Sequence, residues 1–526
     1  MIKKFIDRLL GKAPAARPAV PLGKRLEIAA AEHGIDQSLL DERAVRVVRT
    51  LQEAGHEAYI VGGAVRDLLL GLRPKDFDVA TNATPEQVKA LFRRAFVIGR
   101  RFRIVHVIFG RGRDHEVIEV STFRALLDAA EAEQISGNEK TSKLELSGKA
   151  HAVDASGRVL RDNVWGPQIE DAARRDFSVN ALYYDPTAQT VVDYHHGFQD
   201  AKKRVLRMIG DPATRYREDP VRIVRVVRFA AKLGFAIDPK TRAPIREMAT
   251  LLTNVPASRL FDEMIKLLQT GHALKSLEQL RLQGLDRGVF PILDAALHPA
   301  TQTPQRERFV QLVLADTDRR VADGLPVAPS FMLACLLWHE VLERWQTLRA
   351  GGETPFPALQ QAVDAVFDAR IGDISGRGKL AADMREIWLM QPRFERRTGN
   401  TPRALVEQPR YRAAYDFLRL RADAEEVPAE LAEWWEDFAL GDEDDRVALL
   451  QSVREQQGPR RVPLASGRGA PAPSALSAPA PGAQAGAEAS AGDAPPRKRR
   501  RRRRKPVAGD GSAAAATEPA AAPRAD

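Results

Sequence analysis

Two periods of apolar residues mark the first part of the chain, from about residue 41 to residue 123. Helical spacing predicts three helices: DERAVRVVRTLQEAG, ending at Gly55; AVRDLLLG, stopped by Gly71; and TPEQVKALFRR, with Thr84 as N-cap and Pro85 at its first position. Strands are predicted in the short runs EAYIVGG and DFDVAT and in two alternating segments, FRIVHVIFG and HEVIEVSTF. We therefore expect a small α/β domain whose last strand ends near Phe123.

The pattern changes beyond this domain. Residues 125–160 are polar and irregular and predict a long mobile insertion, whereas the chain from Asp162 to about residue 455 has helical spacing almost throughout. Beyond residue 457, Pro, Ala, Gly and Ser predominate, which is typical of disorder. We therefore expect five parts: an N-terminal extension (1–40), an α/β head (41–160) with the insertion at 125–160, a helical neck (161–270), a helical body (271–456) and a disordered tail (457–526).

Composition indicates buried cores and no membrane span. Apolar residues make up 44% of the 526 positions. No apolar run reaches the ~18–20 residues that cross a bilayer, and there is no clear secretory signal. The single cysteine, Cys335, cannot form an intrachain disulfide, which fits a reducing cytoplasm. We expect this thiol to be buried, and we expect five of the six tryptophans to be core anchors rather than platforms for base stacking: Trp338, Trp345, Trp388, Trp434 and Trp435.

The first twelve residues, MIKKFIDRLLGK, place apolar side chains at helical spacing with basic residues opposite. Such a helix could lie on a membrane surface, but a short docking helix or a frayed helix is favoured. We therefore expect a cytoplasmic protein, with peripheral membrane association through this helix left open.

Positive charge is concentrated at one place near the C-terminus. The net charge of the chain is +10, and nine cations stand together in RKRRRRRRK, residues 497–505. A run of like charges cannot pack together, and it attracts polyanions, nucleic acid above all. We expect this tail to bind nucleic acid; the alternatives are a solubilising terminus and a contact with acidic proteins.

The residues with the clearest chemistry lie in Tyr59–Pro85, YIVGGAVRDLLLGLRPKDFDVATNATP. Residues two apart on a strand face the same way, so Asp76 and Asp78 are expected to project together, with Phe77 turned into the core. Two carboxylates on one face repel each other unless a cation lies between them, and Mg²⁺ takes carboxylates together with phosphate oxygens. Two-metal sites use this arrangement for attack at phosphorus. An Asp-x-Asp occurs often by chance, but the preceding strand and Gly-Gly turn strengthen the hypothesis.

Two further features extend this candidate site. Gly62 and Gly63 close the preceding strand and let backbone N–H groups approach an anion at the start of the next helix. Arg66, one turn into that helix, can add positive charge for a bound triphosphate; the alternative is a tight turn with a surface arginine. In HEVIEVSTF, alternation gives Glu119 a defined face. If its strand pairs beside the strand of the two aspartates, Glu119 becomes a third carboxylate; otherwise it is an exposed strand residue.

Together these motifs resemble a known family. Gly-Gly-x-Val-Arg-Asp followed by Asp-x-Asp is similar to the nucleotidyltransferase superfamily, and more narrowly to its class II group of bacterial poly(A) polymerases and tRNA CCA-adding enzymes. Three later segments fit the same group: EDAARRDFSVNALYYD, RYREDPVRIVRVVRFAAKLGF and SRLFDEMIKLL. Specific motifs cover about residues 45–270, and the resemblance continues more loosely through the helical region. It implies an α/β nucleotidyltransferase head followed by an all-α neck that binds nucleotide and RNA and an all-α body that binds RNA.

The resemblance also implies roles for single residues in the chain before residue 219. Asp76 and Asp78 would hold metal ions, with Glu119 beside them, and the glycine turn with Arg66 would contact the phosphates of the nucleotide. The ARRDF segment would line the nucleotide pocket through two residues: Arg175 and Asp176. Asp176 would lie near the ribose or assist catalysis.

In the neck, the resemblance implies that Asp219 and Arg222 face the base and that Arg225 and Arg228 close the pocket. A carboxylate only accepts hydrogen bonds and a guanidinium only donates them, so this pair matches adenine and cytosine and disfavours uracil and guanine. The pair does not choose between adenine and cytosine. A competing interpretation is a simple helix start, with Asp219 as N-cap and Pro220 at the first position, and with the arginines on a solvated face.

Within the group, the three later segments, the insertion and the basic tail are closer to the poly(A) polymerase branch, although Ala64 stands where a third glycine is expected. That branch implies template-independent addition of AMP from ATP to RNA 3′ ends, with release of pyrophosphate, two Mg²⁺ ions, a role in RNA processing and decay, and contacts with RNA-decay proteins through the tail. A CCA-adding enzyme is the alternative within the class. A non-catalytic RNA-binding protein, which predicts loss of the carboxylates, is the alternative outside it.

Overall fold

The computed structural model describes residues 22–99, 103–110, 115–126, 133–134, 151–153, 159–298, 303–370 and 378–457. The amphipathic segment at residues 1–12, the basic tail beyond residue 457 and most of the insertion lie outside these ranges, so the predictions made for them stay predictions.

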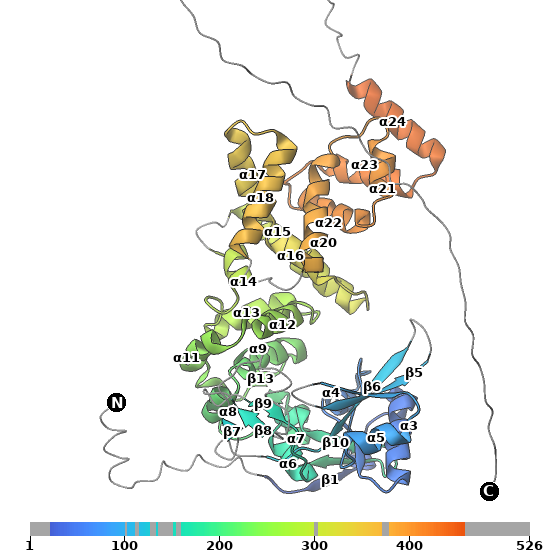
Figure 1. Cartoon of the computed structure of the whole chain (residues 1–526), viewed down its shortest axis with the longest axis vertical. Helices are drawn as coiled ribbons and strands as arrows, with labels where there is room; N and C mark the ends of the chain where they lie inside the picture. The colour runs from blue at the N-terminus through green and yellow to red at the C-terminus, as the bar shows by residue number, and fades with distance from the viewer. Residues whose placement is uncertain are drawn as a thin grey trace, which may run out of the picture. The chain divides into compact units, whose positions relative to one another are not determined.

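An eight-stranded sheet forms the framework of the head (Figure 1), with the strand order β1-β11-β10-β2-β3-β6-β5-β4. Its strands are β1 (Leu26–Ala29), β2 (Ala58–Val61), β3 (Asp78–Thr81), β4 (Ala95–Ile98), β5 (Ile104–Phe109), β6 (Glu116–Thr122), β10 (Leu182–Asp185) and β11 (Thr190–Asp193). All neighbouring strands run antiparallel except β3 and β6, which are parallel, with Asp78 opposite Glu119. The sheet therefore brings two of the predicted acidic residues side by side.

The predicted helices and strands between residues 41 and 123 are confirmed. Helix α3 (Glu42–Glu53) begins after Asp41, whose carboxylate accepts hydrogen bonds from two backbone N–H groups. Helix α4 (Gly63–Leu69) follows β2 directly. Helix α5 (Pro85–Leu91) has the predicted Thr84 cap, completed into a capping box by Gln87. Apolar residues of these helices pack with alternate strand residues into one core on one face of the sheet.

Two expectations about the head are wrong. The sheet does not end near Phe123, because β1 lies before residue 41 and the hairpin β10–β11 lies beyond Asp162, in a region predicted to be almost wholly helical. The insertion is also not simply irregular: three short strands, β7 (Glu133–Gln134), β8 (His151–Val153) and β9 (Val159–Asp162), form a small sheet of their own. The head thus uses chain from both sides of the segment expected to contain it.

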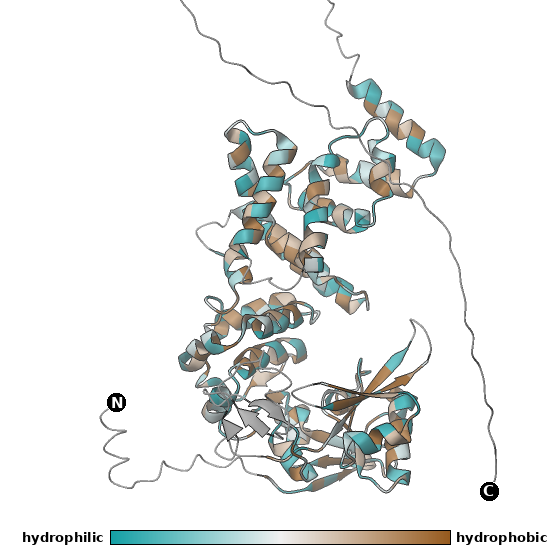
Figure 2. Cartoon of the chain, viewed as in Figure 1, coloured by the Kyte–Doolittle hydropathy of each residue, from teal (hydrophilic) through white to brown (hydrophobic). Residues whose placement is uncertain are grey.

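The rest of the described chain is mainly helical. Its helices and strands are α2 (Ala30–His33), α6 (Gln168–Ala173), α7 (Gly197–Lys203), β12 (Val205–Leu206), α8 (Pro212–Glu218), α9 (Val221–Leu233), β13 (Ala236–Ile237), α10 (Pro239–Arg242), α11 (Ile245–Met248), α12 (Ala257–Leu268), α13 (Ala273–Gln283), α14 (Pro291–Ala296), α15 (Pro304–Ala322), α16 (Pro329–Leu336), α17 (Trp338–Ala350), α18 (Pro355–Ala369), α20 (Gly378–Met390), α21 (Thr401–Val406), α22 (Tyr411–Asp423), α23 (Ala429–Leu440) and α24 (Glu443–Gln457). In Figure 2 most of these helices carry both hydrophilic and hydrophobic bands, as expected for helices with one buried face. None of the described helices is both long and apolar enough to cross a membrane.

One continuous apolar core runs from Phe177 in the expected neck to Ala424 in the expected body, without a break at residue 270. The five tryptophans predicted to be core anchors are all buried, as is Cys335. These aromatic side chains therefore stabilise the helical part and are not platforms for base stacking.

Candidate functional site

Eleven of the twelve predicted site residues line one pocket of about 600 Å³. The pocket is built from the β2–α4 turn, the loop before β3, the segment before β10, and helices α9 and α12. The eleven residues are Gly62, Gly63, Arg66, Asp76, Asp78, Arg175, Asp176, Asp219, Arg222, Arg225 and Arg228. The twelfth, Glu119, is not part of the lining but stands next to Asp78 in the sheet.

The two aspartates meet at the start of β3. The strand begins at Asp78, so Asp76 lies in the preceding loop and not on the strand as expected; both carboxylates nevertheless line the pocket, and Phe77 between them is buried. Burial in the pocket and the negative charges of Glu119 and Asp76 raise the pKa of Asp78 to about 6, although Arg175 opposes the shift. A raised pKa means that the ionised carboxylate lacks full compensation by the surrounding protein cations.

Glu119 has the neighbour predicted from its strand. It pairs in register with Asp78 across the parallel β3–β6 ladder, and its Oε1 lies 3.2 Å from Nε2 of His106 on β5. The described part of the chain contains no group of three or more His, Cys, Asp or Glu side chains already gathered around a common point. Glu119 thus flanks the two aspartates without closing a cage with them.

Gly62 makes the turn from β2 into α4. Its backbone has φ 77° and ψ −126°, a conformation that only glycine adopts without strain, and its N–H donates to the carbonyl of Leu182 at 3.0 Å. This hydrogen bond fastens the turn to β10, the strand that sequence reasoning placed in a helical region. The rest of the turn is left facing the pocket.

Substituting Gly62 with alanine should lower the free energy of unfolding by about 1–3 kcal/mol, because a Cβ is strained at this φ. Gly63→Ala is the matched control, since a Cβ there would meet its nearest neighbour, a nitrogen of Arg66, at an ordinary 3.5 Å. Denaturant unfolding of the two variants and the wild type measures the effect. Equal stability of both variants would contradict a strained turn at Gly62.

Arg66 is a buried residue, so the alternative of a surface arginine is wrong. Its side chain is 3% exposed. Its guanidinium donates to Oδ1 of Asn180 at 2.7 Å and to Oδ1 of Asp67 at 2.7 Å and 2.9 Å. These two residues hold the cation against the glycine turn, where an anion in the pocket would meet it.

Arg175 and Asp176 point to different partners. The guanidinium of Arg175 donates to Asp171 at 3.0 Å and to the hydroxyl of Tyr183 at 3.2 Å. Asp176 accepts from Nε of Arg225 at 2.9 Å and from the N–H of Phe177 at 2.8 Å. Burial alone would raise the pKa of Asp176, but Arg225 lowers it to about 2. Asp176 is therefore ionised at neutral pH, which favours a structural or binding role over proton transfer.

The neck residues are held by ion pairs with other residues. Asp219 accepts from Arg259 of α12 at 3.0 Å, and Arg222 donates to Glu218 at 3.0 Å. Asp219 is the C-cap residue of α8, and Pro220 is the N-cap of α9 without a side-chain hydrogen bond, so the interpretation of Asp219 as a helix N-cap is wrong.

The arginines of α9 do not form a solvated face either. Arg228 donates to the buried Glu263 of α12 at 3.1 Å, and Arg225 is bound to Asp176. Three guanidinium groups lie against the ring of Phe229, which also lines the pocket: those of Arg66, Arg225 and Arg228. The cations of helix α9 therefore line the pocket and pack against the apolar ring of Phe229.

Sequence reasoning missed several lining residues: Lys75, Asn180, Phe229, Lys232, Arg259 and Glu263. All of them lie in segments that the resemblance had already singled out. Asn180 follows the ARRDF motif, and Arg259 and Glu263 are four apart in SRLFDEMIKLL, so that both lie on one face of α12. That spacing was the available signal for the two α12 residues.

The chain matches three family models. They are described as the poly A polymerase head domain (residues 58–207), the probable RNA and SrmB-binding site of polymerase A (234–297) and the polymerase A arginine-rich C-terminus (351–468). The head-domain match passes residue 160, as the sheet does.

Similar curated proteins agree with these matches. The chain is 41% identical over 464 residues to a poly(A) polymerase I of Escherichia coli O157:H7, covering 88% of this chain and 96% of that protein. It is 42% identical over 433 residues to the poly(A) polymerase I of Haemophilus influenzae, covering 82% and 91%. A CCA-adding enzyme of Bacillus subtilis is 35% identical over 243 residues, covering 46% of this chain and 54% of that enzyme.

Proposed function

The chain belongs to the poly(A) polymerase I family of template-independent polynucleotide adenylyltransferases, and from this we propose that the pocket between the glycine turn, Asp78 and α9 binds ATP and the RNA 3′ end. In the reaction of this family, the 3′-hydroxyl attacks the α-phosphate of ATP, AMP is added and pyrophosphate leaves. The observation that carries the proposal is the convergence of acidic residues from the head and cationic residues from the neck on one pocket.

We propose that Asp76 and Asp78 hold Mg²⁺, with Glu119 as a neighbour. The uncompensated charge on Asp78 fits a cation, and Mg²⁺ completes its coordination with phosphate oxygens and water, so two protein carboxylates suffice. When bound, Mg²⁺ would activate the attacking hydroxyl and neutralise the charge that develops on the leaving pyrophosphate. The residues of the chain supply the site, its negative charge and the position of both substrates.

The contribution of Glu119 can be tested within one strand. Glu119→Gln should raise the Mg²⁺ concentration needed for half-maximal activity by about 10–100-fold, the range for residues next to a metal's own ligands. Glu116→Gln is the matched control, because Glu116 lies on the same strand but, three residues from Glu119, on its opposite face, and it pairs with Phe109. Identical Mg²⁺ dependence of both variants would remove Glu119 from the metal site.

The remaining lining residues would bind the nucleotide. The glycine turn and Arg66 would contact the triphosphate, Arg175 and Asp176 would line the pocket near the ribose, and the neck would contact the base. For the base we propose Asp219 and Arg222, which offer an acceptor and a donor to adenine, with Arg225 and Arg228 completing the wall. Arg222 already donates to Glu218, so binding of ATP would require its guanidinium to divide its N–H donors between Glu218 and the base.

Incubating the purified protein with a generic RNA and one nucleoside triphosphate at a time tests the proposal. Long tails from ATP alone are expected, with little incorporation of UTP or GTP. Addition restricted to tRNA and dependent on CTP would instead indicate a CCA-adding enzyme. No incorporation of any nucleotide would indicate an RNA-binding protein without activity.

We also propose that the tail binds RNA in the cytoplasm, where it could bring RNA-decay proteins to the same transcript. Deleting residues 497–505 should weaken RNA binding at low salt and reduce the slope of log affinity against log salt by up to about 6, since each phosphate contact with single-stranded RNA adds about 0.7. Deleting residues 506–526, a mostly neutral segment, is the control. An unchanged slope after the first deletion would mean that the tail does not bind RNA.

A further inference from the structure

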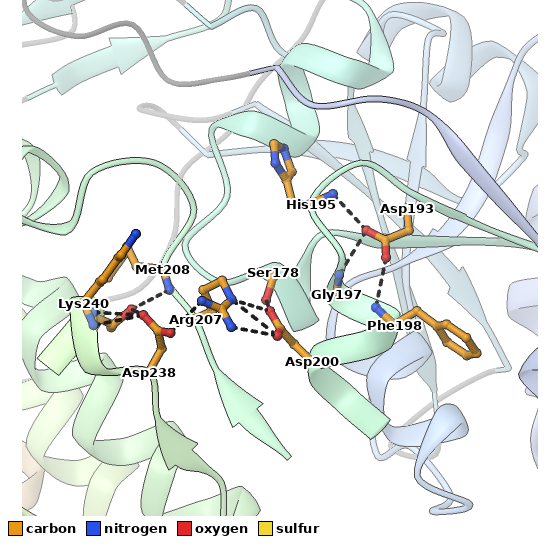
Figure 3. A network of polar contacts seen from close by, with 11 residues as sticks. Ser178, Asp193, His195, Gly197, Phe198, Asp200, Arg207, Met208, Asp238 and Lys240 are labelled. Atoms are coloured by element: carbon orange, nitrogen blue, oxygen red, sulfur yellow. Dashed lines mark hydrogen bonds and ion pairs between the residues drawn. The ribbon is translucent and has the colours of Figure 1, made fainter. Parts of the chain in front are cut away.

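Arg207 joins the head to the neck outside the nucleotide pocket (Figure 3). Its Nε donates to Oδ2 of Asp200 on α7 at 3.0 Å, and its Nη1 donates to Oδ1 of Asp238, the N-cap residue of α10, at 2.6 Å. The rigid fork of one guanidinium thus connects two carboxylates that belong to different parts of the fold.

Both carboxylates are held firmly by their own surroundings. Asp200 is 4% exposed and also accepts from the hydroxyl of Ser178 at 2.7 Å. Asp238 is buried and accepts from the N–H groups of Lys240 at 3.1 Å and Thr241 at 3.2 Å. Because neither acceptor can move freely, the fork of Arg207 fixes the distance between them.

The start of helix α7 packs directly against the backbone of Ser178, two residues after Asp176. Asp193 accepts three backbone N–H hydrogen bonds at the start of α7, from His195, Gly197 and Phe198 (Figure 3). A Cβ on Gly197 would lie only 2.1 Å from the carbonyl oxygen of Ser178, so the helix start rests directly on that backbone. A displacement of α7 would therefore move the segment that contains Asp176.

The backbone of residues 205–209 is hydrogen-bonded on one edge to the segment that contains Asp176 and on the other edge to β13. On one edge, Ser178 donates to the carbonyl of Arg207 and Ile209 donates to the carbonyl of Asp176, both at 3.0 Å. On the other edge, β12 pairs with β13, which follows α9 in the chain. Asp176 is attached to one edge of this short segment, and Arg225 is carried by the helix that leads to the other.

We propose that Arg207 is a positioning residue that sets the geometry of the Asp176–Arg225 pair in the nucleotide pocket. The inference rests on the proposed function of that pocket. Arg207 would act by holding α7 and α10 at a fixed separation, so that the carboxylate from the head and the guanidinium from the neck meet in the arrangement that receives ATP. Among the described residues, its side chain forms hydrogen bonds and ion pairs with Asp200 and Asp238 and with no residue of the pocket lining.

Arg207→Lys tests this role with the charge retained. A lysine ammonium lacks the planar fork and cannot bridge both carboxylates in the same way. We expect KM for ATP to rise about 3- to 30-fold, the range for changes that act through a packed network, with KM for RNA unchanged. Arg204→Lys is the matched control, because Arg204 is exposed and its side chain has no hydrogen bond or ion pair with the described residues. A purely structural role of Arg207 would lower the melting temperature and leave KM for ATP at the wild-type value.

A double-mutant cycle on kcat/KM for ATP then identifies the route of the effect. Substitutions without shared partners normally add, so Arg207→Lys and Arg225→Lys should be additive unless Arg207 acts through the pair. We expect the fold-loss of kcat/KM in the double variant to be at least about threefold smaller than the product of the two single fold-losses. Additive losses, or equal KM in Arg207→Lys and Arg204→Lys, would overturn the inference.

A second variant and the activity of the wild type complete the test of Arg207. If Arg207→Lys does not fold, Asp238→Asn weakens the same bridge while keeping an acceptor for the start of α10, and the same rise in KM is expected. Absence of AMP incorporation by the wild type would refute the proposed function itself, whereas an active wild type with unchanged variants would refute only the role of Arg207.

Discussion

Replacing Asp78 with asparagine should lower AMP incorporation at least about a thousandfold, equivalent to about 4 kcal/mol of transition-state stabilisation. Asparagine keeps the shape of the side chain but removes the negative charge that Mg²⁺ requires, and metal ions contribute several kcal/mol in phosphoryl-transfer sites. The folded protein should be no less stable, because burial, together with the negative charges of Glu119 and Asp76, raises the pKa of Asp78, so that its ionised carboxylate does not stabilise the fold. Single-turnover AMP addition and denaturant unfolding measure the two effects.

Asp76→Asn should behave in the same way, and Glu116→Gln, an exposed carboxylate on the neighbouring strand, should keep wild-type activity. Binding of ATP measured without turnover separates loss of chemistry from loss of the pocket. Near-normal AMP addition by either aspartate variant would mean that the acidic pair does not hold the catalytic metal ions.

The sequence was sufficient to predict which residues meet at the acidic corner of the head, because its motifs are local. Asp76 and Asp78 are two residues apart, and the Gly62 turn precedes them in the same short stretch. The pairing of Glu119 with Asp78 is a long-range contact that the sequence left conditional: alternation with Ile118 and Val120 set the face of Glu119 but not the strand beside it.

The hairpin β10–β11 was missed for a physical reason. Its first strand, Leu182–Asp185, follows directly on a motif of polar and charged residues, and its first three side chains, Leu182, Tyr183 and Tyr184, are all buried because both faces are covered. A short apolar run without alternation does not distinguish a buried strand from a helix. The β-branched and aromatic residues on both sides of the turn Pro186–Gln189 were the stronger indication of a hairpin.

The partners of the motif residues could not be derived from the sequence. Asp219 was expected to cap a helix or face a base, and the structure pairs its carboxylate with Arg259, forty residues later. Such pairs depend on how α12 packs against α9, and composition or spacing within one segment carries no information on that packing. The sequence predicted which residues line the pocket better than how they hold one another.

Breaking the Asp176–Arg225 pair should have the second-largest effect. Asp176→Asn or Arg225→Met should each lower the free energy of unfolding by about 3 kcal/mol, because each leaves a charge without its partner in a largely buried setting. The lower end of the usual range applies because Arg225 keeps 32% of its side-chain exposure, against 11% for Asp176. Both variants should also lose most AMP incorporation, since both side chains line the pocket proposed to bind ATP.

The pH dependence distinguishes an ion pair from simple packing at this position. The pKa of Asp176 is about 2 when folded, below its ordinary value of 3.8, so the ionised form stabilises the fold by about 2 kcal/mol above roughly pH 5, and this contribution is lost as pH falls towards 2. The stability difference between the wild type and Asp176→Asn should therefore shrink between pH 7 and pH 3.5. The double variant Asp176→Asn with Arg225→Met should lose less free energy of unfolding than the sum of the two single losses, because it removes both charges and leaves neither unpaired. A difference that is constant with pH, or losses that simply add, would mean that Asp176 and Arg225 stabilise the pocket by packing and not through their charges.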